Sequence, residues 1–319
     1  MKKYFFILLA LGLIVVAFVG ALFYSQNLLF LAKNPKNDSS EPPFFLAAES
    51  QVNLYPLRDW KVNEPKLNAE IAFLSDIDSN FTFFQKNPNL RRPIASITKL
   101  MTAFVAKKYL PNQTAITINE RIFGFDGINN VLKPGEVLTV EDLLKILLLV
   151  SSNNAANALA DGFGQEQFIK LMNEEAKNMN LTQTTFRDPS GLSLGNQSTA
   201  EDLKRLTQHI LKEEPETFAI TQEDEASVTS EDKKFIHSLK NINLLAHSPK
   251  FLEELNIKYL GGKTGFTDEA KETFLGLFSV PSQKFSGQYR RVLVVVLNSA
   301  SRYNDIESLL RWLKTAYVF

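Results

Sequence analysis

The first 24 residues hold a continuous apolar segment. After Lys2 and Lys3, the 21 residues Tyr4–Tyr24 carry no charged side chain. A helix of this length, rising about 1.5 Å per residue, can cross a hydrocarbon core about 30 Å thick. A cleaved signal peptide usually has an apolar core of only about 7–15 residues, although Val19-Gly20-Ala21 offers a cleavage site. We therefore predict a membrane anchor or signal segment at residues 1–25, with the rest of the chain exported across the cell membrane.

Residues 26–67 lack a periodic pattern and are predicted to form a linker. They contain Asn34-Pro35 and Pro42-Pro43, which favour turns and interrupt helices. From residue 68 to residue 319 the apolar positions become periodic, which predicts one folded domain.

This domain begins and ends with strand patterns that enclose a helical middle. Strands are predicted at 69–74, 81–85, 272–280 and 290–298. Helices are predicted at 96–110, 168–179, 200–213 and 306–317. A further helix has Thr139 as its N-cap and runs into the apolar stretch Ile146–Val150, which predicts its burial. The order predicts an α+β fold with one sheet and a helical insertion, and it leaves Thr221–Lys234 as a charged surface stretch.

Composition narrows the possible chemistry. Lys plus Arg and Asp plus Glu both number 35, so the zero net charge gives no electrostatic case for a nucleic-acid partner. Cysteine is absent, which excludes disulfides, thiolate metal sites and cysteine nucleophiles. The three histidines, His209, His237 and His247, have no zinc-ligand spacing and offer little material for a histidine-based triad. No metal or cofactor is implied.

The motif Ser96-Ile97-Thr98-Lys99 places a serine and a lysine three residues apart at a predicted helix start. Such positions share one helix face, so the amine can lie beside the hydroxyl. A lysine whose pKa is lowered by burial can act as the base for a serine nucleophile. The spacing alone is a weak signal, because Ser230-Glu231-Asp232-Lys233 fits it too and a solvated helix turn explains most examples.

Two further motifs follow along the chain. Ser151-Ser152-Asn153 comes directly after the apolar helix and offers a hydroxyl and an amide, although a helix cap explains it equally well and Ser152-Asn153-Asn154 has the same spacing. Lys263-Thr264-Gly265 can bind a carboxylate through its lysine and threonine. Gly265 would let a substrate backbone lie close to the strand, while a glycine-rich turn is the ordinary explanation.

In this order the three motifs form the signature of penicillin-binding proteins and class A β-lactamases. The chain resembles the low-molecular-mass D-alanyl-D-alanine carboxypeptidases, serine peptidase family S11, from about Ala69 to Leu313. The resemblance is carried by the segments Pro93–Ala103, Ser151–Asp161, Thr185–Leu192 and Gly262–Thr267. The second of these favours the register in which Ser151 and Asn153 are the functional pair.

The resemblance implies a β-lactamase/DD-peptidase-like α+β catalytic domain over residues 68–319, with an antiparallel sheet flanked by helices and a helical subdomain. Ser96 would be the nucleophile that forms an acyl-enzyme, Lys99 the general base, and Ser151 the proton relay to the leaving D-alanine. The substrate would be bound by Asn153, Lys263, Thr264, Gly265 and Phe266, and the backbone N–H groups of Ser96 and Phe266 would form the oxyanion hole.

The resemblance also implies the partners. These are peptidoglycan stem peptides as substrate and β-lactam antibiotics as acylating inhibitors. The apolar N-terminal helix, and not the resemblance, predicts the membrane as a further partner. Three alternatives stay open. A β-lactamase would need a deacylating glutamate, for which Glu174 with Asn178 has a compatible spacing. A DD-endopeptidase would cleave the same kind of bond, and an inactive domain would bind the cell wall only.

The chain departs from many relatives just after its lysine-threonine-glycine motif. They carry an Ala-Gly pair where this sequence has Ala270-Lys271. This difference concerns the local fit of the substrate and leaves the chemistry unaffected.

Overall fold

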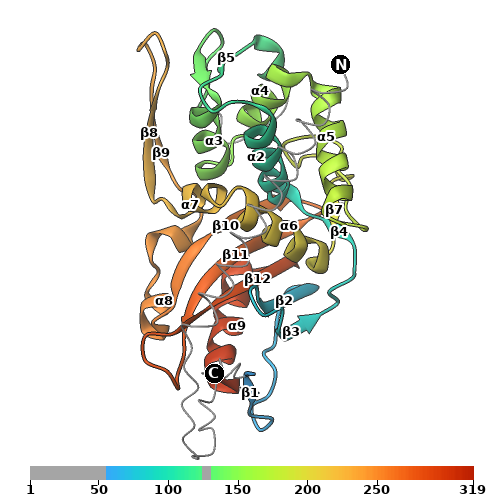
Figure 1. Cartoon of the computed structure of the whole chain (residues 1–319), viewed down its shortest axis with the longest axis vertical. Coiled ribbons are helices and arrows are strands. Elements are labelled where there is room, and N and C mark those ends of the chain that lie inside the picture. Colours follow the sequence, from blue (N-terminus) through green and yellow to red (C-terminus); the bar gives the residue numbers. More distant parts are fainter. Residues whose placement is uncertain (1–54, 124–130) are drawn as a thin grey trace, which may run out of the picture. The chain divides into compact units, whose positions relative to one another are not determined.

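A computed structural model describes residues 55–123 and 131–319 (Figure 1). Its centre is a five-stranded antiparallel sheet in the order β10-β11-β12-β2-β3. The strands are β2 (Ile71–Asp76), β3 (Thr82–Lys86), β10 (Lys258–Thr267), β11 (Lys271–Pro281) and β12 (Tyr289–Ser299). All four strands predicted from the sequence lie in this sheet, and the predicted α+β class is confirmed.

Both faces of the sheet are covered, and β12 shows why its sequence is apolar throughout. Val292, Val294 and Val296 face one hydrophobic core, whereas Leu293, Val295 and Leu297 face the other. The first core packs α8 (Lys250–Leu255) and α9 (Arg302–Ala316) on the sheet. Successive strand residues point to opposite faces, so a strand that is buried on both sides reads as a continuous apolar run.

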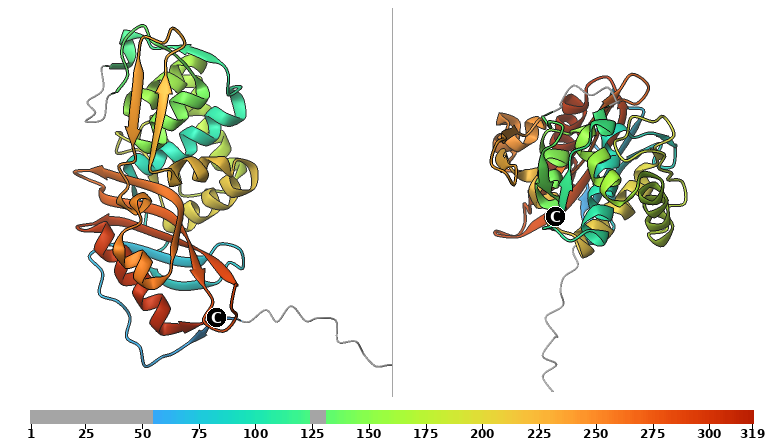
Figure 2. Two further views of the ribbon diagram at one scale, coloured as in Figure 1. Left: turned by 90° about the vertical axis from the view of Figure 1, so that its left-hand side faces the viewer. Right: turned by 90° about the horizontal axis from the view of Figure 1, so that it is seen from above.

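The second core joins the sheet to a helical group, which Figures 1 and 2 show on the side of the sheet away from α9. The prediction of a buried helix is confirmed, because α3 is buried along nearly its whole length and Thr139 caps it through the backbone N–H of Asp142. The helices of this group are α2 (Thr98–Tyr109), α3 (Val140–Leu149), α4 (Asn153–Phe163), α5 (Gln165–Asn178), α6 (Ala200–Glu213) and α7 (Glu216–Gln222).

Short elements connect these layers. Single-turn 3-10 helices in the described part of the chain are η1 (Ala95–Ile97), η2 (Glu120–Phe123) and η3 (Leu244–His247). Two small strand pairs brace the loops: β4 (Arg92–Pro93) with β7 (Gln197–Ser198), and β5 (Ala115–Thr117) with β6 (Val137–Thr139).

The stretch Thr221–Lys234 is largely exposed, as the sequence predicts. The sequence did not predict its secondary structure, because β8 (Glu225–Thr229) lies within it and forms a hairpin with β9 (Ile236–Lys240). In β8 only Val228 is buried, so its charged and small neighbours conceal the strand pattern. Ser230 lies in the turn between the two strands, where its hydroxyl donates a hydrogen bond to Asp232. The serine–lysine spacing from Ser230 to Lys233 is therefore not on a helix.

The end of the segment that we assigned to a linker pairs with the C-terminus. β1 (Leu57–Arg58) forms a two-stranded sheet with β13 (Tyr317–Val318). The apolar segment Tyr4–Tyr24 lies outside the described residues. Within residues 55–123 and 131–319, no helix is long and apolar enough to cross a membrane.

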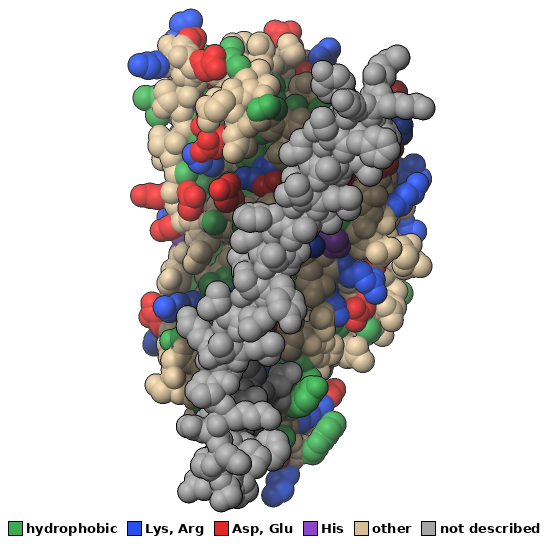
Figure 3. Space-filling model, in the orientation of Figure 1, with side chains coloured by type: hydrophobic (Ala, Val, Ile, Leu, Met, Phe, Trp, Pro, Cys, Tyr) green, Lys and Arg blue, Asp and Glu red, His purple; other side chains and the backbone are tan. Residues whose placement is uncertain are grey.

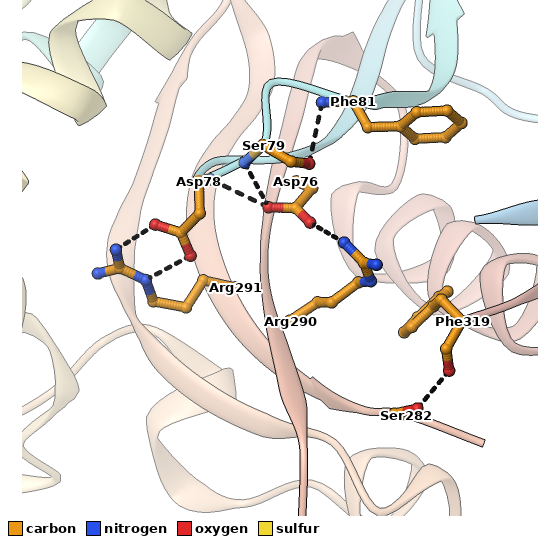
Figure 4. A network of polar contacts seen from close by, with 8 residues as sticks. All are labelled: Asp76, Asp78, Ser79, Phe81, Ser282, Arg290, Arg291 and Phe319. Carbon is orange, nitrogen blue, oxygen red and sulfur yellow. Dashed lines mark hydrogen bonds and ion pairs between the residues drawn. The ribbon is translucent and has the colours of Figure 1, made fainter. Parts of the chain in front are cut away.

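Ion pairs fasten the end of the sheet where β2 turns into β3 (Figure 4). The Asp76 carboxylate accepts hydrogen bonds from the backbone N–H groups of Asp78 and Ser79, and it forms an ion pair of 2.6 Å with Arg290 of β12. Asp78 pairs with Arg291. Elsewhere on the visible face, basic and acidic side chains are interspersed, in keeping with the zero net charge (Figure 3).

Asp305 connects three elements at the opposite end of β2, and its loss should destabilise the fold. Its buried carboxylate accepts the backbone N–H groups of Asn68 and Ala69 and the hydroxyl of Ser299. We expect Asp305→Ala to lower the free energy of unfolding by about 3 kcal/mol, because buried donors lose their acceptor. Urea denaturation measures the change, and Glu307→Ala on the same helix is the control. Equal stability of both variants would contradict the role of Asp305.

Candidate active site

Ser96 lies in η1, at the point where the chain enters α2, and its side chain is partly exposed. The preceding Ala95 has a left-handed backbone with φ of 47°. Two glycines approach this turn from different segments. A Cβ at Gly191 would lie 2.1 Å from the carbonyl oxygen of Ala95, and one at Gly265 would lie 2.7 Å from the backbone nitrogen of Ser96. Any larger residue at either position would displace the nucleophile.

Gly265 also has a role in packing that the sequence did not predict. β10 packs directly on the Ser96 turn, with the side of Gly265 facing Ser96 and Thr273. The glycine is required by packing within the protein itself. The approach of a substrate backbone to this glycine stays a prediction.

Lys99 connects the nucleophile to two other segments. It is fully buried in the first turn of α2, and its Nζ lies 2.9 Å from Ser96 Oγ, 2.7 Å from Asn153 Oδ1 and 2.6 Å from the carbonyl oxygen of Ser190. Burial lowers the pKa of Lys99 to about 7, against the opposing effect of the Asp188 carboxylate. Near neutral pH a substantial fraction of the amine is thus uncharged and can accept the proton of the Ser96 hydroxyl.

The loop that carries Ser190 is held by a carboxylate and an amide. Asp188 accepts the backbone N–H groups of Ser190, Gly191 and Ser193. Asn196 accepts the backbone N–H groups of Arg187 and Asp188, and its amide nitrogen donates to Thr98 Oγ1 in α2. The loop and the nucleophile helix are thereby fixed relative to each other.

The structure supports the Ser151–Asn153 register. Ser152 is the N-cap of α4, where its buried hydroxyl accepts the N–H of Ala155, so it is occupied by a structural role. Asn153 begins α4 and contacts Lys99. Ser151 lies two residues before Asn153, is partly exposed, and has a left-handed backbone with φ of 58° at the junction of α3 and α4.

The third motif lies on the edge strand β10. Lys263 is buried and its Nζ donates to the carbonyl oxygen of Thr264 at 2.8 Å. Burial, together with the positive charges of Lys99 and Arg302, holds the pKa of Lys263 well below its usual range. Thr264 is nearly buried, whereas Phe266 is exposed. Lys99 contacts Asn153 of the second motif, and its charge lowers the pKa of Lys263 in the third. Gly265 of the third motif packs on Ser96. The three motifs therefore meet at one site.

Four residues of this site were not assigned roles from the sequence: Asp188, Ser190, Asn196 and Arg302. The first three belong to or follow the family-like segment Thr185–Leu192, which we had noted without giving its residues roles. Arg302 at the start of α9 donates to the carbonyl oxygens of Gly265 and Thr273 and lies 3.3 Å from the Glu272 carboxylate. It belongs to no local motif.

The glutamate considered for deacylation has another setting. Glu174 lies on α5, where it forms an ion pair with Lys170 one turn earlier and its side chain is 45% exposed. This is the ordinary environment of a surface helix residue.

Known proteins resemble this chain over most of its length. Residues 59–301 match the Peptidase S11 family model, described as D-alanyl-D-alanine carboxypeptidase. The chain is 29% identical over 264 residues to a D-alanyl-D-alanine endopeptidase of Escherichia coli (strain K12), covering 80% of each chain. It is 32% identical over 244 residues to the D-alanyl-D-alanine carboxypeptidase DacF of Bacillus subtilis (strain 168), covering 74% of this chain and 59% of the relative.

Solved structures give the same result. A D-alanyl-D-alanine carboxypeptidase from Mycobacterium tuberculosis H37Rv has a TM-score of 0.69 and 27% identity, with 80% of this chain and 94% of that chain covered. Penicillin-binding protein D2 from Listeria monocytogenes, in its ampicillin-bound form, has a TM-score of 0.64 and 27% identity, with 78% of this chain and 98% of that chain covered.

The lowered pKa of Lys99 predicts how the reactivity of Ser96 depends on pH. The rate of acylation by a reactive β-lactam should rise as pH increases through about 7 and then level off, because the uncharged amine is the base. In Asp188→Asn the rise should move to lower pH, since the carboxylate that raises the pKa of Lys99 is removed. Glu166→Gln on α5 is the control for a lost surface charge.

Stopped-flow acylation across the pH range measures both effects. A rate in the unsubstituted protein that does not change between pH 5 and 9 would contradict the role of Lys99 as a base. A rise that moves to higher pH in Asp188→Asn would contradict the electrostatic account.

Proposed function

The chain belongs to the D-alanyl-D-alanine carboxypeptidase family, peptidase family S11, and on this premise we propose that it removes the terminal D-alanine from peptidoglycan stem peptides. The observation that carries the proposal is the position of the buried Lys99 amine, 2.9 Å from the Ser96 hydroxyl and 2.7 Å from Asn153. A serine activated by a lysine of lowered pKa is suited to acyl transfer without a histidine.

In the proposed reaction, the carboxylate of the terminal D-alanine binds beside Thr264, near the Lys263 amine and the positive charge of Arg302. Ser96 Oγ attacks the carbonyl carbon of the preceding D-alanine, and its proton passes to the uncharged Lys99 amine. The negative charge that develops on the carbonyl oxygen is held by the backbone N–H groups of Ser96 and Phe266. Asn153 holds the substrate amide.

Collapse of this intermediate breaks the peptide bond. The nitrogen of the departing D-alanine takes up, through Ser151, the proton that Lys99 accepted, which leaves an ester between the peptide and Ser96 and returns the Lys99 amine to its uncharged form. Water then attacks the ester while the Lys99 amine accepts its proton. The ester bond breaks, Ser96 Oγ takes that proton from Lys99, and the shortened peptide is released. A penicillin would acylate Ser96 in the same way, but its ring-opened product stays attached and cannot diffuse away as D-alanine does.

Endopeptidase action on peptide cross-links is the second candidate. Two relatives that are matched over 80% of their own length are D-alanyl-D-alanine endopeptidases, from Escherichia coli (strain K12) and Pseudomonas aeruginosa. The acylation step is identical in both activities. They differ in the amine that leaves, which is free D-alanine in one and the side chain of a neighbouring stem peptide in the other.

We further propose that the enzyme acts outside the cytoplasmic membrane and is held there by the segment Tyr4–Tyr24. The length of this uncharged segment supports the proposal, as does the location of peptidoglycan outside that membrane.

Acylation of Ser96 by a penicillin tests the proposed function. We expect a stoichiometric adduct in the intact mass of the detergent-solubilised full chain, mapped to Ser96 by peptide analysis and absent from Ser96→Ala. The adduct should persist for minutes, and D-alanine should be released from a pentapeptide that ends in D-Ala-D-Ala. Rapid destruction of the drug would favour a β-lactamase. Folded protein that forms no adduct and leaves the drug intact would favour an inactive wall-binding domain.

A further inference from the structure

Phe266 directly follows the Lys263-Thr264-Gly265 motif and has an exposed apolar side chain. Its side chain is 57% exposed, although it directly follows Gly265, which packs on the nucleophile. An exposed aromatic ring one residue along the strand from that contact leaves a large apolar area available to a substrate.

The alternation of β10 determines which part of the site this ring faces. Lys263 and Gly265 lie on the side of the strand that meets Ser96 and Lys99, so Thr264 and Phe266 lie on the other side. Thr264 is the residue expected to contact the terminal carboxylate. Phe266 therefore lies on the same side as the carboxylate of the leaving amino acid.

Arg302 places the ring more closely. Phe266 lies opposite Glu272 in the strand register, and Glu272 holds Arg302 through an ion pair of 3.3 Å. Arg302 also donates to the carbonyl oxygen of Gly265, at 2.7 Å, just before Phe266. These contacts anchor the guanidinium next to the backbone that carries the exposed ring.

We propose that the Phe266 side chain is the wall of the leaving-group subsite and selects for a small departing amino acid. This inference rests on the proposed function. The ring contacts the methyl group of a terminal D-alanine and keeps water from the contact between its carboxylate and Thr264 and Arg302, which strengthens that contact. A larger leaving group, such as the cross-linked side chain of a second stem peptide, has to displace the ring. Phe266 therefore favours carboxypeptidase over endopeptidase action.

The test compares two substrates in the full-length protein. One is a pentapeptide that ends in D-Ala-D-Ala, and the other is a purified cross-linked dimer of stem peptides. Phe266→Ala keeps the backbone N–H and removes the wall, while Phe266→Leu retains part of the apolar surface. Ile236→Ala removes an exposed apolar side chain from the β8–β9 hairpin and is the matched control.

We expect Phe266→Ala to lower kcat/KM for the pentapeptide about tenfold, as for other lost apolar contacts. The ratio of kcat/KM for the dimer to that for the pentapeptide should rise by at least about tenfold, with Phe266→Leu in between and Ile236→Ala unchanged. A ratio that stays within about twofold of the parent in Phe266→Ala would overturn the proposal. Failure of the parent protein to cleave either substrate or to form a penicillin adduct would instead overturn the proposed function.

Discussion

The active site depends on a single buried amine. A lysine with no exposed side-chain surface is costly in a folded protein unless its hydrogen bonds are satisfied, and here Ser96, Asn153 and the carbonyl oxygen of Ser190 satisfy them. These acceptors come from η1, α4 and the loop after residue 187, so the amine fixes three distant segments at one point. The burial that makes the amine difficult to accommodate also lowers its pKa to about 7, so a substantial fraction of the amine is uncharged at neutral pH, as the proposed role as a base requires.

The nucleophile is positioned by the contact of the sheet with the helical group. Ile94 and Ile97 anchor the Ser96 turn in the core between them, while Gly191 and Gly265 let a loop and the edge strand lie against its backbone. Asp188 and Asn196 then fix the loop to α2 through backbone N–H groups and Thr98. The geometry around Ser96 therefore follows from packing, because the same contacts join the sheet to the helical group.

Two lysines and an arginine gather around the site, and two carboxylates lie near them. Lys99 has Asp188 nearby, Arg302 has Glu272, and Lys263 is buried close to Lys99 and Arg302. Such an arrangement suits a substrate that brings its own negative charge, as a peptide with a free terminal carboxylate does. In the proposed function, charge accounts for the binding of the carboxylate, and the exposed Phe266 ring accounts for the size of the amino acid that carries it.

The sequence by itself determined the class of fold, the strands of the sheet, the buried helix capped by Thr139, and the three motifs whose residues meet at Ser96. These features are local, because periodicity, helix caps and short motif spacings depend only on residues that are close in the sequence. Only the tertiary structure decided that Ser190 faces Lys99 from 91 positions away, that Arg302 lies behind Gly265, and that Gly265 serves packing. The structure also shows the β8–β9 hairpin. Few residues of this hairpin are buried, so its sequence has no clear alternation of apolar and polar positions. Contacts between distant segments depend on how strands and helices pack, and no local pattern records that packing.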